Sequence, residues 1–423
     1  MGKLCIHPTP LSGRVTIPPS KSAAHRAIIC ASLACGISRI TNISLSDDIA
    51  ATIGAMRALG AVIKEDGNRL TIDGSHTLKT SAAVIDCIES GSTLRFLIPI
   101  AAAGGIHATF TGRGRLPQRP IGIYTDCLPA HGITCETAGG LPLTTSGTLQ
   151  PGRFSLRGDV SSQFITGLLL ALPLLCGDSE IVLTTPLESK PYVDMTLATQ
   201  RAFGIQIEQT EQGFIVPGNQ RYRACDYRVE GDYSQAAFFL MAGAMGSAIC
   251  CCGLSEQSTQ GDQACIPLCT AFGGQVSWKD GDLCAVPGKL HGIEIDAMDI
   301  PDLVPALAVC ASVADGTTRI YNAARLRIKE SDRIEAVCNM LTCLGGCARQ
   351  TDDGLLITGV SQLRGGTVDA CGDHRIAMAA AIAATRCTDD VLIDGYESVR
   401  KSYPNFFEDY QTLGGRWDVV NMG

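Results

Sequence analysis

The sequence is poor in aromatic residues and lacks the short motifs that accompany common cofactors. Phe, Trp and Tyr make up 5% of the 423 residues. The phosphate-loop pattern GxxxxGK[ST] and the dinucleotide pattern GxGxxG are both absent, so ATP or a dinucleotide has no motif support. HExxH and EF-hand patterns are absent as well. We therefore expect no cofactor and no metal at the functional site.

Long hydrophobic runs and excess positive charge are also missing. The longest apolar run, residues 164–177, is too short to span a bilayer and is interrupted by Gly167 and Pro173. The N-terminus has no apolar segment of the kind found in signal peptides. A formal net charge of −8 disfavours a nucleic-acid partner. These features predict a cytoplasmic protein that binds neither membranes nor nucleic acid.

Cysteine is abundant, but its pattern is not that of a metal or disulfide framework. The 20 cysteines include no CxxC pair. Most lie inside apolar runs, as Cys250, Cys251 and Cys252 do. The favoured interpretation is that cysteine serves as a small buried hydrophobic residue in a reducing compartment.

A long repeat runs through the chain. A helix-like segment that ends in glycine recurs every 69 or 72 residues, at Gly60, Gly132, Gly204, Gly273, Gly345 and Gly414. After most of these glycines comes a polar stretch with alternating apolar residues, which is typical of a β-hairpin. An Ala/Leu-rich helix that starts with Ser or Asp precedes each segment. Each repeat thus reads as helix, strand, helix, strand, strand.

Six such repeats favour two globular domains of three repeats each, because three repeats give an ordinary domain size. An elongated solenoid is the alternative. The leading segment has the alternation of a strand that the last, truncated repeat lacks. We therefore assign residues 14–227 to an N-terminal domain, and residues 1–13 plus 228–423 to a C-terminal domain.

Basic residues stand beside the expected helix starts. Helix N-termini carry unpaired N–H groups and a partial positive charge, so they favour anions. In a helix, Lys21, Ser22, His25 and Arg26 would share one polar face within an arc of about 140°. For this cluster alone, a solvated charged face is the plainer interpretation.

The same signal recurs elsewhere in an otherwise acidic chain. Lys329, Glu330 and Arg333 are predicted to share one helical face. Further basic groups occur at Arg113, Arg115, Arg119, His374, Arg375, Arg400 and Lys401. A focused positive site in a negative protein suits a small ligand with several negative charges.

Nine stretches, taken as a set, resemble the 5-enolpyruvylshikimate-3-phosphate synthase family in order and spacing. They are PSKSAAHRA, ESGSTLRF, LPQRPI, SSQFITGLL, ESKPY, IPDLVPALA, RLRIKESDR, GDHRIAM and RKSYPNF. The resemblance implies an α/β (α+β) fold of two similar domains, each with three βαβαββ-type repeats in an inside-out α/β barrel. It places the active site in the interdomain cleft and implies a monomer.

The activity that the resemblance implies is the sixth step of the shikimate pathway to chorismate. The enolpyruvyl group of phosphoenolpyruvate is transferred to the 5-hydroxyl of shikimate 3-phosphate through a tetrahedral intermediate, and phosphate is released. Both substrates are anions that carry phosphate and carboxylate groups. They belong to the ligand class that the charge pattern favours.

The resemblance also implies which residues bind each substrate. The residues for shikimate 3-phosphate would be Lys21, Ser22, Arg26, Ser161, Ser162, Gln163, Ser189, Tyr192, Asp302, Arg325 and Lys329. Those for phosphoenolpyruvate would be Lys21, Gly91, Arg119, Gln163, Arg333, Arg375 and Lys401. Arg325 stands where well-known members carry an asparagine that contacts the shikimate phosphate, and we expect it to replace that contact.

Proton transfer has several candidates under the same resemblance. Asp302 would be the base for the 5-hydroxyl, and Glu330 or Lys21 the acid for the methylene carbon. His374 is a further catalytic candidate. The plainer alternatives are an ion-pair role for Glu330, helix capping for His374 and packing against substrate for Tyr192.

Two rival functions remain. The sister enzyme that transfers enolpyruvate to UDP-N-acetylglucosamine is disfavoured because GRGRLPQRP lacks that family's usual reactive cysteine. A catalytically inactive anion-binding scaffold is disfavoured because Lys21, Asp302, Glu330, Arg333 and Lys401 are all present.

The absence of a side chain at position 91 generates a first prediction. A methyl group there would narrow the phosphoenolpyruvate pocket that the resemblance implies. We expect Gly91→Ala to weaken inhibition by glyphosate-type compounds more than it weakens substrate binding. The measurement is the inhibition constant beside KM for phosphoenolpyruvate, and equal losses in both would contradict the prediction.

Overall fold

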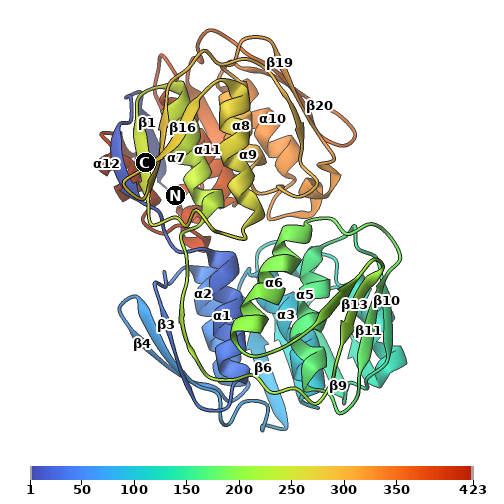
Figure 1. Ribbon diagram of the computed structural model, residues 1–423. Helices are drawn as coiled ribbons and strands as arrows, with labels where there is room; N and C mark the ends of the chain where they lie inside the picture. Colours follow the sequence, from blue (N-terminus) through green and yellow to red (C-terminus); the bar gives the residue numbers. More distant parts are fainter. Residues whose placement is uncertain (1, 421–423) are drawn as a thin grey trace. The chain divides into compact units, whose positions relative to one another are not determined.

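A computed structural model of the chain describes residues 2–420, which form two compact units (Figure 1). The N-terminal unit comprises residues 19–230. The C-terminal unit comprises the described residues up to 18 together with those from 231 onward. Each unit contains three of the six four-stranded sheets found in the described residues.

The sheets of the N-terminal unit have the orders β14-β3-β5-β4, β6-β7-β9-β8 and β10-β11-β13-β12. In each order the first two strands are parallel and the remaining neighbours antiparallel. The strands are β3 (Ile37–Thr41), β4 (Val62–Asp66), β5 (Arg69–Asp73), β6 (Ala82–Asp86), β7 (His107–Thr111), β8 (Ile133–Glu136), β9 (Leu143–Gly147), β10 (Arg153–Leu156), β11 (Ser179–Leu183), β12 (Glu208–Thr210), β13 (Gly213–Val216) and β14 (Asp226–Arg228).

The helices of this unit follow the predicted repeat, with two helices in each repeat. They are α1 (Lys21–Leu33), α2 (Asp47–Ala58), α3 (Gly91–Ala103), α4 (Gly122–Cys127), α5 (Ser162–Ala171) and α6 (Lys190–Ala202), with short 3-10 turns at η1 (Leu116–Gln118), η2 (Leu128–His131) and η3 (Leu172–Leu174). Helices α1, α3 and α5 are buried along most of their length. A helix that is apolar on all sides must be enclosed by other elements.

The C-terminal unit repeats the same sheet pattern. Its sheets have the orders β16-β17-β15-β2, β18-β19-β21-β20 and β22-β23-β1-β24. The strands are β1 (Lys3–His7), β2 (Gly13–Thr16), β15 (Ile249–Cys252), β16 (Gln275–Lys279), β17 (Asp282–Val286), β18 (Glu294–Asp296), β19 (Thr317–Tyr321), β20 (Cys347–Gln350), β21 (Leu355–Thr358), β22 (Gly366–Asp369), β23 (Val391–Asp394) and β24 (Arg416–Val420).

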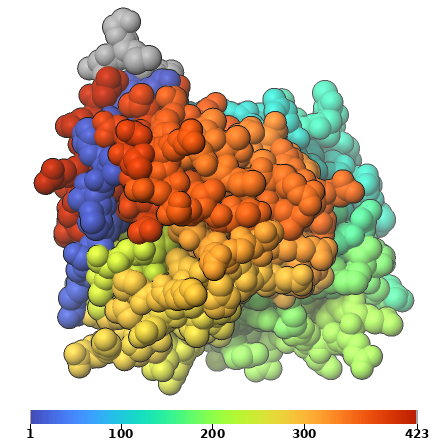
Figure 2. All heavy atoms as spheres, turned by 90° about the horizontal axis from the view of Figure 1, so that it is seen from above, coloured from blue at the N-terminus to red at the C-terminus, as the bar shows by residue number. Residues whose placement is uncertain are grey.

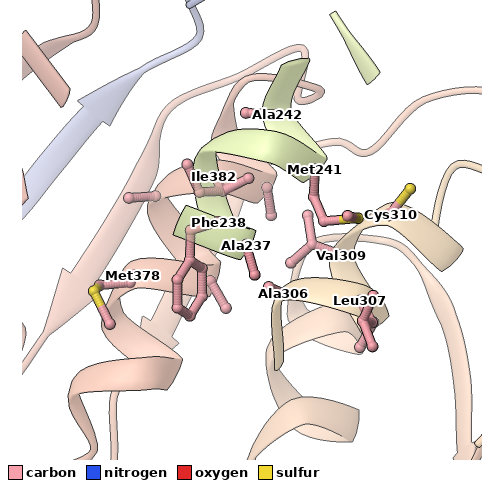
Figure 3. Close-up of a cluster of buried hydrophobic side chains, with 14 of the residues drawn as sticks. Ala237, Phe238, Met241, Ala242, Ala306, Leu307, Val309, Cys310, Met378 and Ile382 are labelled. Atoms are coloured by element: carbon pink, nitrogen blue, oxygen red, sulfur yellow. The ribbon is translucent and has the colours of Figure 1, made fainter. Parts of the chain in front are cut away.

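Its helices are α7 (Tyr233–Met245), α8 (Cys265–Phe272), α9 (Val304–Ala311), α10 (Arg333–Cys343), α11 (His374–Ala384) and α12 (Phe406–Thr412), with 3-10 turns at η4 (Gly261–Ala264), η5 (Ala324–Ile328) and η6 (Tyr396–Lys401). Every residue of α7, α9 and α11 is buried. These three helices form the centre of the unit, and their side chains interlock in its core (Figure 3). Labelled examples are Phe238 on α7, Leu307 on α9 and Ile382 on α11.

The N-terminal strands belong to the sheets of the C-terminal unit. Strand β1 lies between β23 and β24 and is antiparallel to both. Figure 2 shows the blue N-terminal segment beside the red C-terminal segment on the surface of this unit. The division between the units falls after Pro18, later than the predicted start at residue 14, because β2 pairs in parallel with β15. The second division falls after Glu230, three residues beyond the predicted position 227.

The six glycines that mark the repeat share one backbone conformation. Each follows a helix and has a φ between 80° and 108°, in the left-handed region. Glycine enters this region without the steric cost that a Cβ imposes, so it ends a helix and turns the chain toward the next strand. The predicted glycine C-caps are therefore confirmed.

The interpretation of the cysteines is wrong for one pair. Cys250 on β15 and Cys284 on β17 lie directly opposite each other and form a disulfide, with their Cα atoms 4.0 Å apart. Cysteines such as Cys30 and Cys310 are buried as expected, whereas Cys176 and several others are exposed. Apolar sequence surroundings do not reveal which residue a neighbouring strand places opposite.

The central helices generate a stability prediction. Leu307→Ala removes a fully buried side chain from α9 and leaves a cavity, so it should lower the free energy of unfolding by about 2–5 kcal/mol. The same change at Leu45, which is 45% exposed, should cost less than about 0.5 kcal/mol. Urea denaturation of both variants measures the difference, and similar losses would contradict the assignment of the core.

Candidate active site

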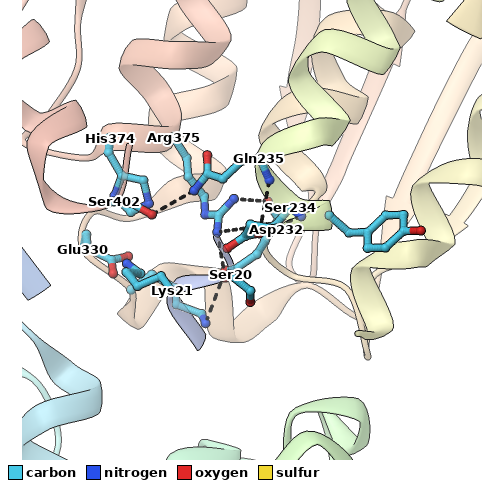
Figure 4. A network of polar contacts seen from close by, with 12 residues as sticks. Ser20, Lys21, Asp232, Ser234, Gln235, Glu330, His374, Arg375 and Ser402 are labelled. Carbon is cyan, nitrogen blue, oxygen red and sulfur yellow. Dashed lines mark hydrogen bonds and ion pairs between the residues drawn. The ribbon is translucent and has the colours of Figure 1, made fainter. Parts of the chain in front are cut away.

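In the C-terminal unit, the N-terminal ends of α7 and α11 lie together (Figure 4), and Arg375 links them to Asp302 just ahead of α9. Asp232 caps α7 by accepting from the backbone N–H of Ser234, and Asp373 caps α11 by accepting from that of Arg375. Arg375 joins the ends, because its Nη2 donates to Ser234 Oγ at 2.9 Å and to Asp302 Oδ2 at 3.0 Å. Asp302 lies just ahead of α9. Clustering of these helix ends was expected if the repeats pack in register.

Arg333 is the centre of this cluster. Its side chain is 1% exposed, and all three guanidinium nitrogens donate to carboxylates. Nε lies 2.8 Å from Asp373 Oδ2, Nη1 lies 2.9 Å from Asp302 Oδ1 and Nη2 lies 2.6 Å from Glu330 Oε2. Burial alone would lower the pKa of Arg333, but these carboxylates outweigh it and raise that pKa well above its ordinary value.

Asp302 is the carboxylate that most cations share. Besides Arg333 and Arg375, Lys329 Nζ lies 3.7 Å from Asp302 Oδ1. Burial opposes ionisation of Asp302, but the charges of Arg375, Lys329 and Arg333 outweigh it and hold the pKa of Asp302 well below its ordinary range. Asp302 is therefore a carboxylate anion in this arrangement.

The pKa of Lys329 is also lowered, but for an amine this shift favours the neutral form. Burial lowers the pKa of this lysine to about 8, although the neighbouring Asp302 acts in the other direction. An amine with such a pKa exists in both protonation states near neutral pH. It is able to hold an anion or to exchange a proton.

The predicted common helical face of Lys329, Glu330 and Arg333 is wrong. Helix α10 begins at Arg333, because the Asp332 side chain accepts from the N–H of Glu335 and caps the helix there. Lys329 and Glu330 precede it in an extended segment after η5. An ion pair, and not helical spacing, brings Glu330 to Arg333.

The remaining predicted residues of this unit lie around the cluster. His374 is buried, with Nδ1 3.8 Å from Asp373 Oδ1. Lys401 Nζ donates to the Gly372 carbonyl at 2.7 Å. Arg325 donates to the carbonyl of Met298. Ion pairs thus connect five of the predicted residues, with His374 beside them: Asp302, Lys329, Glu330, Arg333 and Arg375.

In the N-terminal unit, the start of α1 carries a second polar cluster. Lys21 Nζ lies 2.8 Å from Asp48 Oδ2 on α2. Arg26 is 2% exposed, and its three nitrogens donate to Thr196 Oγ1, the Ser22 carbonyl and the Tyr192 carbonyl. Burial lowers the pKa of Arg26 to about 10. These bonds use three of the five N–H donors, which leaves two for an anion.

The alternative of a solvated charged face is wrong for this helix. His25 is 1% exposed, and its Nδ1 lies 2.7 Å from Thr52 Oγ1. The chain of hydrogen bonds continues through Thr93 Oγ1 to Ser90 Oγ. Burial, followed by the charges of Lys21 and Arg26, holds the pKa of His25 well below its ordinary value. A neutral His25 therefore helps to fix the start of α1.

The predicted residues of α5 are held by their neighbours. Ser161 caps the helix by accepting from the N–H of Gln163 at 3.3 Å. The Gln163 side chain donates to Ser92 Oγ at 2.9 Å and accepts from Arg95 Nη1 at 2.6 Å. Ser162 is the first residue of α5 and is buried. The amide of Gln163 thus has one fixed orientation.

Ser189 stands out by its backbone. It is 3% exposed, and its φ of 55° lies in the left-handed region, which is unfavourable for a residue with a Cβ. It directly precedes α6, which also carries Tyr192. Strained residues of this kind are commonly found at ligand sites.

Gly91 lies against the guanidinium of Arg119. A Cβ atom at Gly91 would lie 2.5 Å from Arg119 Nη1 and 2.8 Å from its Cζ. Arg119 is 8% exposed, and within residues 2–420 its buried Nε has no hydrogen-bond partner. The absence of a side chain at Gly91 therefore leaves space for the Arg119 guanidinium, whose buried Nε–H can donate to a ligand.

Comparison with known proteins assigns the chain to a family. The sequence model of EPSP synthase (3-phosphoshikimate 1-carboxyvinyltransferase) matches residues 6–410. The chain belongs to this family. It is 48% identical to 3-phosphoshikimate 1-carboxyvinyltransferase of Clostridium kluyveri and 47% identical to that of Clostridioides difficile, with 100% of each chain covered. Its fold matches a solved EPSP synthase from Acinetobacter baumannii with a TM-score of 0.82 at 26% identity, over 100% of both chains.

Within the described part of the chain, no helix is both long and apolar enough to cross a membrane.

Several residues that build the clusters were not among the predicted site residues, although Asp373 and Ser234 lie at helix starts that the sequence predicted. Asp48 pairs with Lys21, Arg95 orients Gln163, and Asp373 binds Arg333. Ser234, which accepts from Arg375, is a fourth. A weak signal existed for two of them, because Arg95 and Asp373 lie inside the family stretches ESGSTLRF and GDHRIAM. Asp48 lies in no such stretch.

The environment of Lys329 generates a pH prediction. Its side chain is 26% exposed and its pKa is about 8, so acylation of this amine should be half-maximal near pH 8. Asp302→Asn removes a charge that raises this pKa, so the midpoint should move to lower pH. Peptide mass spectrometry after brief acylation measures it, with exposed Lys64 as the internal reference. A midpoint that coincides with that of Lys64 would contradict the prediction.

Proposed function

We propose that the chain transfers the enolpyruvyl group of phosphoenolpyruvate to the 5-hydroxyl of shikimate 3-phosphate and releases phosphate. The observation that carries the proposal is the match of the EPSP synthase family over residues 6–410. The curated relatives that are 47–48% identical carry the corresponding name, 3-phosphoshikimate 1-carboxyvinyltransferase.

The charge of the C-terminal cluster supports a role for its cations in binding phosphoenolpyruvate. Arg333, Arg375 and Lys329 converge on the single carboxylate of Asp302. Guanidinium groups bind phosphate and carboxylate oxygens through paired N–H donors. We assign phosphoenolpyruvate to Arg333, Arg375 and Lys401, together with Lys21, Gly91, Arg119 and Gln163.

Ligand binding would raise the pKa of Asp302. Without an anionic substrate, this carboxylate neutralises the cations around it and is a weak base, because its pKa is held low. An anion that binds to Arg375 and Arg333 weakens their attraction for Asp302, so its pKa rises. Asp302 then becomes able to accept the proton of the 5-hydroxyl. Substrate binding would thereby create the base that the reaction needs.

The residues assigned to shikimate 3-phosphate lie at helix starts of the N-terminal unit and in the C-terminal cluster. Hydroxyl and backbone N–H donors at a helix N-terminus suit a phosphate group. We assign the substrate to Lys21, Ser22, Arg26, Ser161, Ser162, Gln163, Ser189, Tyr192, Asp302, Arg325 and Lys329. Arg26 would bind its carboxylate with the two donors that its protein contacts leave.

The chemistry consists of addition followed by elimination. As Asp302 takes the hydroxyl proton, the oxygen attacks C2 of the enol, and an acid protonates the methylene carbon. Loss of a proton and of phosphate from the tetrahedral intermediate restores the enol ether. Lys21 and Glu330 are the candidate acids, and His374 is a third candidate for proton transfer. In the structure Glu330 is bound to Arg333 through an ion pair.

Phosphate release from phosphoenolpyruvate tests the proposal. We expect release with shikimate 3-phosphate and none with UDP-N-acetylglucosamine. The assay uses the purified chain alone, because we expect a cytoplasmic monomer that needs no cofactor. Asp302→Asn should lower kcat about 10²- to 10⁴-fold because it removes the base. Asp352→Asn, an exposed aspartate in the same unit, is the control and should leave kcat unchanged.

Each other result has a defined meaning. Release with the sugar nucleotide would reassign the acceptor. Release with neither acceptor would favour an inactive anion-binding scaffold. A normal kcat for Asp302→Asn would leave the reaction in place but remove Asp302 from the role of base.

A further inference from the structure

Four side chains with metal-ligand chemistry gather on one sheet of the C-terminal unit, outside the residues assigned to the reaction. They are Cys5 and His7 on β1, Asp390 just before β23 and Asp418 on β24. No local sequence pattern indicates this group, because the four residues come from opposite ends of the chain. They meet because β1 lies between β23 and β24.

The strand register places all four on the same face. Cys5 is opposite Asp418, and Ile6 is opposite Val391, so Asp390 lies at the level of His7. Leu4 and Ile6 are fully buried on the core face. Because side chains alternate along a strand, Cys5 and His7 point to the other face. Figure 2 shows this part of the unit, where the blue N-terminal segment borders the red segment at the surface.

The three different donor atoms are close enough to share one ion. Sγ of Cys5, a nitrogen of His7 and an oxygen of Asp390 all lie within 4.8 Å of one another. Cys5 Sγ is 3.6 Å from Asp390 Oδ2, and His7 Nδ1 is 2.9 Å from Asp390 Oδ1. In a tetrahedral zinc site, bonds of about 2.3 Å to sulfur and 2.1 Å to oxygen place these two ligand atoms about 3.6 Å apart.

Asp418 completes the arrangement from the far side of the imidazole. His7 Nε2 lies 3.0 Å from Asp418 Oδ2. With an ion bound, Asp418 would accept the Nε2 proton, and the Nδ1 lone pair would bind the ion beside Asp390 and Cys5. A carboxylate on the outer nitrogen of a metal-binding histidine fixes its tautomer and increases its basicity. Histidines that bind metals commonly donate their other ring N–H to such a carboxylate.

We propose that Cys5, His7 and Asp390 form a binding site for a zinc-type divalent transition metal, with Asp418 as the partner that orients His7. The thiolate and the carboxylate balance the charge of the ion, and water occupies the fourth position. The side chains of His7 and Asp390 are 37% and 53% exposed, so the ion reaches the site from solvent. Its role is structural, because it would link the first strand of the chain to β23.

Cobalt(II) provides the test, because thiolate ligands give it an intense near-ultraviolet charge-transfer absorption. The chain is treated with a chelator, desalted and titrated with Co²⁺, and Zn²⁺ is then added in competition. We expect one equivalent of Co²⁺ to produce the absorption and Zn²⁺ to abolish it. Cys5→Ser and His7→Gln should each remove it. Cys176→Ser is the matched control, since Cys176 is exposed and belongs to no group of three metal-ligand residues within residues 2–420.

A graded variant separates coordination from simple folding effects. Asp418→Asn should retain the absorption but weaken Co²⁺ affinity about 10- to 100-fold, as expected for loss of a partner that orients a ligand. Zn²⁺ should raise the melting temperature of the unmodified chain and of Cys176→Ser, but not that of Cys5→Ser. Circular dichroism without metal checks that each variant is folded, and His7→Gln replaces Cys5→Ser if the latter is not. Absence of Co²⁺ binding, or an absorption that persists in both Cys5→Ser and His7→Gln, would overturn the proposal.

Discussion

The buried guanidinium of Arg333 is the group on which the C-terminal cluster depends. Three cations and three carboxylates meet there, and each Arg333 nitrogen has an anionic partner. Buried charges are tolerated only when they are paired and hydrogen-bonded, and removal of one partner leaves an uncompensated charge. The positive and negative charges of the cluster therefore balance. An anion that binds to these cations thus competes with the protein carboxylates.

The carboxylates that balance these charges also determine local structure. Asp373 accepts from Arg333 and also caps α11, and Asp302 accepts from Arg375, the second residue of that helix. The same groups thus fix where α11 begins and where the cations point. Because α7, α9 and α11 are wholly buried, their ends cannot shift without disturbing the core. The packing of apolar residues holds the charges at the distances that anion binding requires.

The sequence predicted the repeating elements well, because their signals are local. Gly60 and its counterparts mark left-handed helix ends, and Ala/Leu-rich runs mark buried helices. Contacts between distant segments could not be predicted from local patterns. The spacing of residues in the sequence does not reveal that Asp373 binds Arg333, or that Cys250 faces Cys284. The assignment of Lys329 and Arg333 to one helix failed because periodicity fits both residues, whereas the cap at Asp332 decides where the helix begins.

The two units use one scaffold for different electrostatic tasks. At the central helix ends of the N-terminal unit, the capping residues are the neutral Ser20, Ser90 and Ser161. At two of the corresponding ends in the C-terminal unit, Asp232 and Asp373 take the capping positions. A neutral cap leaves the partial positive charge of the helix end available to a ligand, whereas a carboxylate cap offsets that charge. The change from Ser to Asp at the cap therefore explains why arginines, and not helix ends alone, supply the positive charge of the C-terminal unit.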